Sequence, residues 1–175
     1  MQPCMKYYNI KNRDHHLSFR EAVTQGISSD MGLFMPATIP SPDRDFFLKL
    51  AQMDFRDIAF EISRIYIEDE IPAPVLRKIC DEAFNFPLIL KQLDEKKYVL
   101  ELFHGPTAAF KDFGARFMSQ CFKYFASLDM NKTVVLVATS GDTGGAIANS
   151  FLGVEGVDVI ILYPSGKVSE IQEKQ

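Results

Sequence analysis

Apolar residues recur at helical spacing through the first half of the chain. They fall three or four positions apart over residues 46–65, and a similar face covers residues 75–83, so helices are predicted in both segments. A Ser-x-x-Glu capping box at residues 18–21 predicts a shorter helix that ends at Gly26. Residues 7–10 have the pattern of a brief extended segment. The first half is therefore predicted to be small and mostly helical.

Strand and helix patterns alternate in the second half. The predicted elements are a strand, a helix, a strand, a helix and a strand, at Tyr98–Phe103, Phe113–Ala126, Thr133–Ala138, Gly144–Leu152 and Val157–Tyr163. This β-α-β-α-β order predicts an α/β fold with parallel strands and right-handed crossovers. Because the pattern changes near residues 85–87, we predict two domains, residues 1–86 and residues 87–175.

Composition excludes several classes of protein. The 175 residues are 47% apolar and 24% charged, which excludes a disordered or collagen-like chain. The net charge is -4 and no long basic run is present, so a nucleic-acid partner is not expected. The longest strongly apolar runs, residues 134–138 and 159–163, are too short to span a bilayer, so no membrane partner is expected. Cys4, Cys80 and Cys121 lack CxxC spacing and favour a cytoplasmic location.

Lys111 stands where a predicted strand leads into a predicted helix. A Gly-Pro turn and the apolar residues 108–110 precede it. The positive end of the helix dipole and the apolar surroundings both disfavour an ammonium group. Because only a neutral amine attacks an aldehyde, Lys111 is a candidate for Schiff-base chemistry. The alternative is an ordinary exposed lysine, followed by Asp112 as an acid at the helix start.

The segment at residues 138–146 follows a buried strand directly. Its small hydroxyl residues and glycines let the backbone approach a ligand closely, and the helix that follows presents N–H groups to an anion. We predict that an oxyanion binds here. The segment lacks both the Gly-Lys-Ser/Thr of a P-loop and the GxGxxG of a dinucleotide site. The alternative is a tight turn that needs glycine only for its geometry.

The histidines do not predict a metal site. His15 and His16 lie in a segment expected to be a polar loop, and no third ligand follows at a useful spacing. His104, seven positions before Lys111, is a candidate for substrate contact or for a structural hydrogen bond. The spacing also allows Arg116 to pair at the surface with Asp112 one helical turn earlier.

The two central segments resemble segments of threonine synthases. The stretch ELFHGPTAAFKDFGARFM at residues 101–118 is similar to their cofactor-lysine segment, and ATSGDTGGA at residues 138–146 is similar to their substrate loop. Residues 18–36 resemble their opening segment, although residues 9–12 and Met31 depart from its usual pattern. The stretches FLGVEGV and GKVSEIQEKQ also fit, so the resemblance covers nearly the whole chain.

The resemblance implies a pyridoxal-phosphate enzyme of the tryptophan-synthase-β fold type, whose second domain would be part of a parallel three-layer αβα sheet domain. Its reaction would be the last step of threonine biosynthesis, from O-phospho-L-homoserine and water to L-threonine and phosphate. Lys111 would hold the cofactor and shuttle protons at the α and β carbons. The same match implies that Phe110 and Asp142 contact the cofactor. It implies substrate contacts from His104, Ser140, Gly141, Asp142 and Thr143.

Threonine synthases are more than twice as long as this chain. The resemblance therefore implies that the loop for the cofactor phosphate lies outside these residues, and that the chain is inactive by itself. A sheet cut part-way exposes an edge and an apolar face, which would allow self-association. Two alternatives stay open: another lyase of this fold type, such as a serine or threonine dehydratase, and a non-catalytic paralogue or interaction module.

Overall fold

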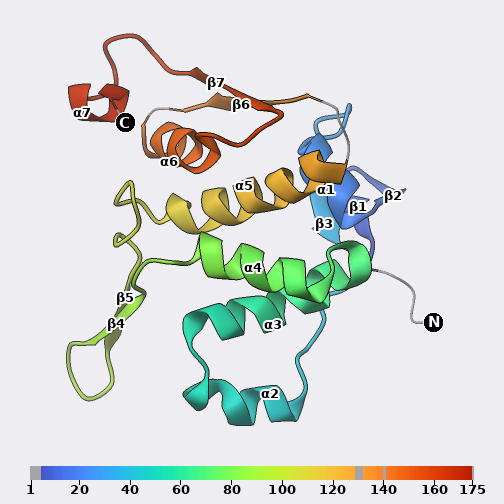
Figure 1. The fold of residues 1–175 in the computed structure, drawn as a ribbon, viewed down its shortest axis with the longest axis vertical. Coiled ribbons are helices and arrows are strands. Elements are labelled where there is room, and N and C mark those ends of the chain that lie inside the picture. The colour runs from blue at the N-terminus through green and yellow to red at the C-terminus, as the bar shows by residue number, and fades with distance from the viewer. Residues whose placement is uncertain (1–4, 129–131, 140, 175) are drawn as a thin grey trace. The chain divides into compact units, whose positions relative to one another are not determined.

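The computed structural model describes residues 5–128, 132–139 and 141–174 (Figure 1). The chain divides into two compact units, of which the first ends at Asp81 and the second begins at Glu82. The division lies inside a helix, a few residues before the sequence change near residues 85–87.

The first unit contains an antiparallel sheet. It consists of β1 (Tyr7–Asn9), β2 (Asn12–Leu17) and β3 (Phe34–Pro36), with β1 in the middle. The prediction of a polar loop at His15 and His16 is wrong, because both lie in β2. Five of the six residues of β2 are polar, so alternation of apolar residues could not reveal it. Pairing with β1 is what makes this segment a strand.

The helices predicted for the first half are present. They are α1 (Phe19–Gln25), α2 (Arg44–Lys49), α3 (Phe55–Ile67) and α4 (Ala73–Ala83), with 3-10 turns at Leu50–Gln52 and Glu68–Glu70. The capping box at the start of α1 is confirmed, since Ser18 Oγ accepts the N–H of Glu21 and the Glu21 carboxylate accepts the N–H of Ser18. The helix ends at Gly26, as predicted. Core residues of α3, α4 and the turn between them include Ile67, Ile71, Leu76, Ile79 and Cys80.

A hairpin opens the sheet structure of the second unit. Its strands are β4 (Ile89–Gln92) and β5 (Tyr98–Glu101), and they pair antiparallel. Asp94 Oδ1 accepts the N–H groups of Lys96 and Lys97 at 3.0 Å and closes the turn. Such a short connection permits only antiparallel pairing. Among the described residues β4 is the one strand that pairs with β5, so the expectation that β5 pairs with a parallel strand is wrong.

The predicted parallel pairing is confirmed for the two later strands. They are β6 (Thr133–Ala138) and β7 (Val157–Leu162), aligned so that each residue of β6 faces its counterpart in β7. Burial alternates along both strands. One face of the pair exposes Val134, Leu136, Ile160 and Leu162.

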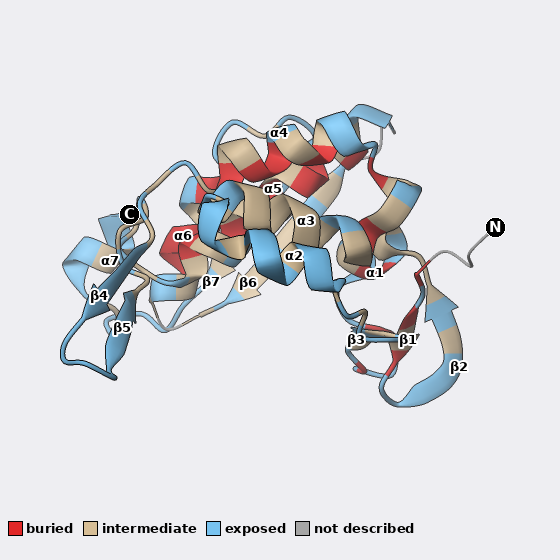
Figure 2. Ribbon diagram, turned by 90° about the horizontal axis from the view of Figure 1, so that it is seen from below, coloured by how far each residue is buried: buried red, intermediate tan, exposed pale blue. Residues whose placement is uncertain are grey.

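Helices cover the other face of the β6–β7 pair. The predicted helices are confirmed as α5 (Lys111–Leu128) and α6 (Asp142–Phe151), and the short α7 (Glu170–Lys174) packs on α6. The helix α6 contacts both strands, and α5 packs against α6 (Figure 1). In Figure 2 the buried residues of this unit gather on α5 and α6, whereas β4 and β5 are exposed. Within the described ranges, no helix has the length and apolar content needed to cross a membrane.

Candidate functional site

Lys111 is the first residue of α5, an 18-residue helix. Its Nζ lies 4.3 Å from the centroid of the Phe110 ring. The turn before it is closed by hydrogen bonds from the N–H of Ala108 to Gly105 O (3.0 Å) and from the N–H of Asp112 to Ala109 O (3.1 Å). The predicted position of this lysine at a helix start is confirmed.

Asp112 and Arg116 do not pair with each other, so that prediction is wrong. The Asp112 side chain is fully buried, and its carboxylate accepts the backbone N–H (2.9 Å) and the hydroxyl (2.7 Å) of Thr107. Arg116 instead donates three hydrogen bonds to residues 82–85, two of them to main-chain carbonyls. The neighbouring turn provides Asp112 with donors, and the end of α4 provides Arg116 with acceptors, so neither needs the other.

His104 has a structural partner. Its Nε2 lies 2.7 Å from Glu101 Oε2 at the end of β5, and both side chains are half-buried. Its ring lies 4.6 Å from that of Phe103, measured between centroids. The structural hydrogen bond weighed from the sequence is therefore present, while contact with substrate stays a prediction.

The glycine-rich segment forms the start of α6. Gly141 precedes the helix with a φ of 156°, in the positive range that side chains rarely adopt. Its carbonyl accepts the N–H groups of Gly144 (2.9 Å) and Gly145 (3.4 Å). A Cβ on Gly144 would lie 2.7 Å from Thr139 Cγ2. The geometry of the turn thus favours glycine at both positions, and anion binding by this segment stays a prediction.

The same geometry leaves room for an anion. Gly141 has no side chain with which to cap α6, so the N–H groups of the first turn can face a ligand. Asp142 and Thr143 form that turn, with Asp142 exposed and Thr143 half-buried. Ser140, the other residue expected here, lies outside the described residues.

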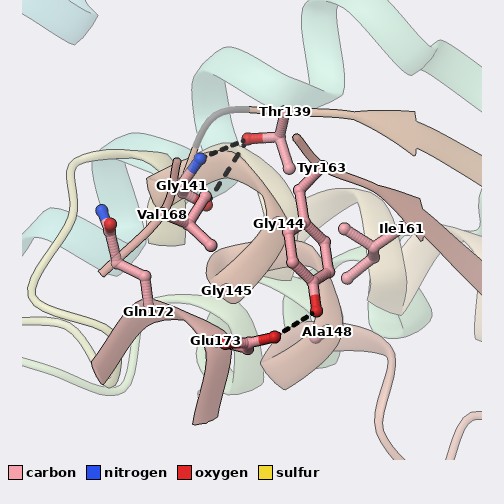
Figure 3. A pocket seen from close by; sticks show the side chains of 10 residues that line it. All are labelled: Thr139, Gly141, Gly144, Gly145, Ala148, Ile161, Tyr163, Val168, Gln172 and Glu173. Atoms are coloured by element: carbon pink, nitrogen blue, oxygen red, sulfur yellow. Dashed lines mark hydrogen bonds between the residues drawn. The ribbon is translucent and has the colours of Figure 1, made fainter. Parts of the chain in front are cut away.

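A cavity of about 150 Å³ lies beside this helix start (Figure 3). Its walls include Thr139, Gly141, Gly144, Tyr163, Gln172 and Glu173. The hydroxyl of Tyr163 donates to Glu173 Oε1 at 2.8 Å, and this bond raises the pKa of Tyr163. Tyr163, Gln172 and Glu173 were not among the residues predicted from the sequence. The only signal for Gln172 and Glu173 was the fit of the GKVSEIQEKQ stretch to the family, and Tyr163 was expected only as the last residue of a strand.

The two motifs come to one end of the second unit. The helices α5 and α6 pack together, and both begin at the end of the unit where β6 and β7 finish (Figure 1). Lys111 opens one helix and the glycines 141–145 open the other. Among the described residues, no group of three His, Cys, Asp or Glu side chains has the arrangement of a metal site.

Known proteins resemble both the sequence and the fold. Residues 6–84 match the family described as "Threonine synthase N terminus". The chain is 44% identical over 170 residues to the threonine synthase of Haemophilus influenzae, and the match covers 97% of this chain and 39% of that one. It is 40% identical over 178 residues to the threonine synthase of Saccharomyces cerevisiae, and this match covers 91% of this chain and 35% of that one.

Solved structures of threonine synthases have the same fold as this chain. The threonine synthase of Escherichia coli superposes with a TM-score of 0.89 at 43% identity, over 97% of this chain and 39% of that one. The pyridoxal-phosphate-bound threonine synthase of Brucella melitensis superposes with a TM-score of 0.90 at 32% identity, over 97% of this chain and 38% of that one. The chain spans about two fifths of the length of the curated relatives it matches. In sequence and in fold it is therefore similar to the N-terminal part of threonine synthases.

Proposed function

We propose that this chain is the part of a threonine synthase that carries the cofactor lysine and the substrate loop. The complete enzyme would convert O-phospho-L-homoserine and water to L-threonine and phosphate. The observation that carries the proposal is the placement of Lys111 and of the glycine-rich start of α6 at one end of the second unit. The names of the relatives support the choice of reaction.

The residues present fit pyridoxal phosphate. A primary amine condenses with an aldehyde and releases water, and Lys111 offers such an amine at the start of a long helix. Phe110 offers an aromatic face beside that amine. When bound, pyridoxal phosphate supplies an electron sink for the bonds at the substrate's α carbon. Lys111, Phe110 and Asp142 would hold it from this chain.

The other residues of the site would bind and orient the substrate. The N–H groups at the start of α6, with Ser140, Gly141, Asp142 and Thr143, would hold the substrate carboxylate. His104, oriented by Glu101, would contact the substrate from the end of β5. The Lys111 amine would move protons at the α and β carbons. Phosphate would leave the γ carbon and water would add at the β carbon, which balances the reaction.

Threonine synthase is favoured over a dehydratase of the same fold type, because residues 6–84 match a domain named for threonine synthase. The matched part is about two fifths of each relative, so we propose that these residues do not turn over substrate by themselves. We also propose the cytoplasmic location expected from three cysteines without CxxC spacing; of these, Cys80 and Cys121 are buried.

The first test is labelling of the purified chain. It is titrated with pyridoxal phosphate, and borohydride then reduces the C=N bond so that peptide mapping identifies the modified lysine. We expect Lys111 to take most of the label. Lys111→Ala should lose it, whereas Lys123→Ala, which changes an exposed lysine of the same helix, should keep it. Label spread evenly over the exposed lysines would argue against a preformed cofactor site in this chain.

Turnover by the complete enzyme separates the remaining alternatives. Lys111→Ala should slow phosphate release from O-phosphohomoserine by about a hundredfold to ten-thousandfold, the usual contribution of one acid–base group. Keto-acid release from serine or threonine, without phosphate release, would instead indicate a dehydratase. Failure of the complete protein to bind the cofactor would indicate a non-catalytic paralogue.

A further inference from the structure

A buried carboxylate lies directly after the candidate lysine. The Asp112 side chain is 0% exposed, although it belongs to the first turn of α5. Its Oδ2 accepts the N–H of Thr107 at 2.9 Å, and its Oδ1 accepts the Thr107 hydroxyl at 2.7 Å. A buried charged group requires such donors, since it has lost its contact with water. Asp112 thus binds the turn before the lysine to the helix after it.

The turn is shaped around this carboxylate. A Cβ on Gly105 would lie 2.4 Å from Asp112 Oδ2, so only glycine lets the chain pass so close. Ala108 has a φ of 53°, a left-handed conformation that a residue with a Cβ keeps only when its surroundings hold it there. The N–H of Ala108 donates to Gly105 O at 3.0 Å and closes the turn. These features fix the backbone on the N-terminal side of Lys111.

We propose that Asp112 is a positioning residue for Lys111, acting through its two hydrogen bonds to Thr107. This inference rests on the proposed function, which gives Lys111 its role. Successive residues of an α-helix are rotated by about 100° around the axis. An Asp112 side chain held inward therefore sets the direction in which Lys111 leaves the helix. Without the two bonds, the turn and the first residue of α5 can move, and the amine loses its fixed place.

The test measures the reactivity of each lysine without any cofactor. Trace acetic anhydride acetylates neutral amines and releases acetate, and mass spectrometry then gives the rate at Lys111 relative to Lys123. Four variants of the full chain are compared with the wild type: Thr107→Val, Thr107→Ser, Asp112→Asn and Thr133→Val. Thr107→Val removes the hydroxyl donor and keeps the shape of the side chain, and Thr107→Ser keeps the donor. Thr133→Val makes the same change at the start of β6, as a control.

We expect the relative rate at Lys111 to change about threefold or more in Thr107→Val and Asp112→Asn, and to return to the wild-type value in Thr107→Ser. Hydrogen exchange of the hydrogen-bonded amides of Ala108 and Asp112 should quicken about tenfold in the same two variants, as expected when a local structure opens more often. Thermal melts monitor folding, and Thr107→Val provides the test if Asp112→Asn does not fold. A relative rate unchanged in a folded Thr107→Val, or a change that Thr107→Ser does not reverse, would overturn the inference.

Pyridoxal-phosphate labelling of the same variants distinguishes this inference from the proposed function. If wild-type Lys111 takes no selective label while its acetylation rate still depends on Thr107, the proposed function fails and the positioning role stands. If wild-type Lys111 takes selective label while its acetylation rate is the same in the wild type and in Thr107→Val, the proposed function stands and the positioning role fails.

Discussion

Gln172 donates a hydrogen bond of 3.0 Å from its Nε2 to Asp142 Oδ1, and this bond joins α7 to the start of α6. The other end of the same amide accepts the hydroxyl of Ser169 at 3.1 Å. Gln172 also lies against Gly141, where a Cβ would be only 2.4 Å from its Nε2. The shape of the proposed substrate loop therefore depends on a segment that lies 30 residues further along the chain.

Gly141→Ala should destabilise the second unit and distort the proposed substrate loop. The variant adds a side chain at a positive φ and brings it against Gln172. Gly153→Ala is the matched control, because Gly153 also has a positive φ (77°) but nothing lies within 4 Å of its Cβ position. The free energy of unfolding of the control should fall by about 1–2 kcal/mol, because of the positive φ alone. Urea unfolding should show a larger decrease in unfolding free energy for Gly141→Ala than for Gly153→Ala. Equal decreases would contradict the predicted contact with Gln172.

Gly114→Ala should stabilise the chain. Gly114 is exposed inside α5, and a Cβ there would meet nothing within 4 Å. Alanine loses less backbone conformational entropy than glycine when it folds into a helix. The free energy of unfolding in urea should therefore rise by about 0.5–1 kcal/mol. Gly105→Ala, nine residues earlier, should be destabilising because of the contact with Asp112. A loss of stability in Gly114→Ala would mean that α5 packs differently around this position.

Acid should weaken the first unit through Asp30. Hydrogen bonds from Ser28 and Asn9 lower the pKa of Asp30 from 3.8 to about 2. A carboxylate whose pKa is lowered by folding stabilises the fold above its unfolded pKa. That contribution disappears as the pH falls from about 4 towards 2. The unfolding free energy of the wild type should therefore fall over this range.

Asp30→Asn should flatten this acid dependence relative to the wild type, since asparagine does not titrate. Asp14→Asn, at an exposed carboxylate of β2, is the control and should keep the wild-type slope. Denaturant melts at half-unit pH intervals give the slopes. Parallel curves for the wild type and Asp30→Asn would exclude Asp30 as the source of the acid sensitivity.

Self-association should depend on the exposed face of the β6–β7 pair. Leu136 and Leu162 lie on it with 63% and 54% of their surface exposed, next to Val134 and Ile160. Exposed apolar patches of this kind favour contact between molecules. Sedimentation velocity should show self-association of the chain at high concentration, reduced in the double variant Leu136→Glu with Leu162→Glu. Ile39→Glu, at an apolar residue of the first unit that is 83% exposed, should leave the self-association unchanged. A wild type that sediments as a monomer at every concentration would refute this prediction.

Short-range signals in the sequence were sufficient for most helices and for the candidate lysine. The capping box at Ser18, the apolar spacing of α3 and the place of Lys111 at the start of α5 all follow from residues within a few positions of one another. The parallel pairing of β6 and β7 followed from the order of strands and helices. Helix caps and periodicity act over one or two turns, which is why they can be recognised without the tertiary structure.

Contacts between distant segments were decided only by the tertiary structure. The sequence determined that Lys111 and the glycines of α6 follow strand patterns, but not that Gln172 closes on Gly141. Nor did it show that β5 pairs antiparallel with β4, or that Arg116 binds residues 82–85 in place of Asp112. A side chain with several potential partners takes those that the folded backbone brings within reach, and that choice depends on the packing of the whole unit.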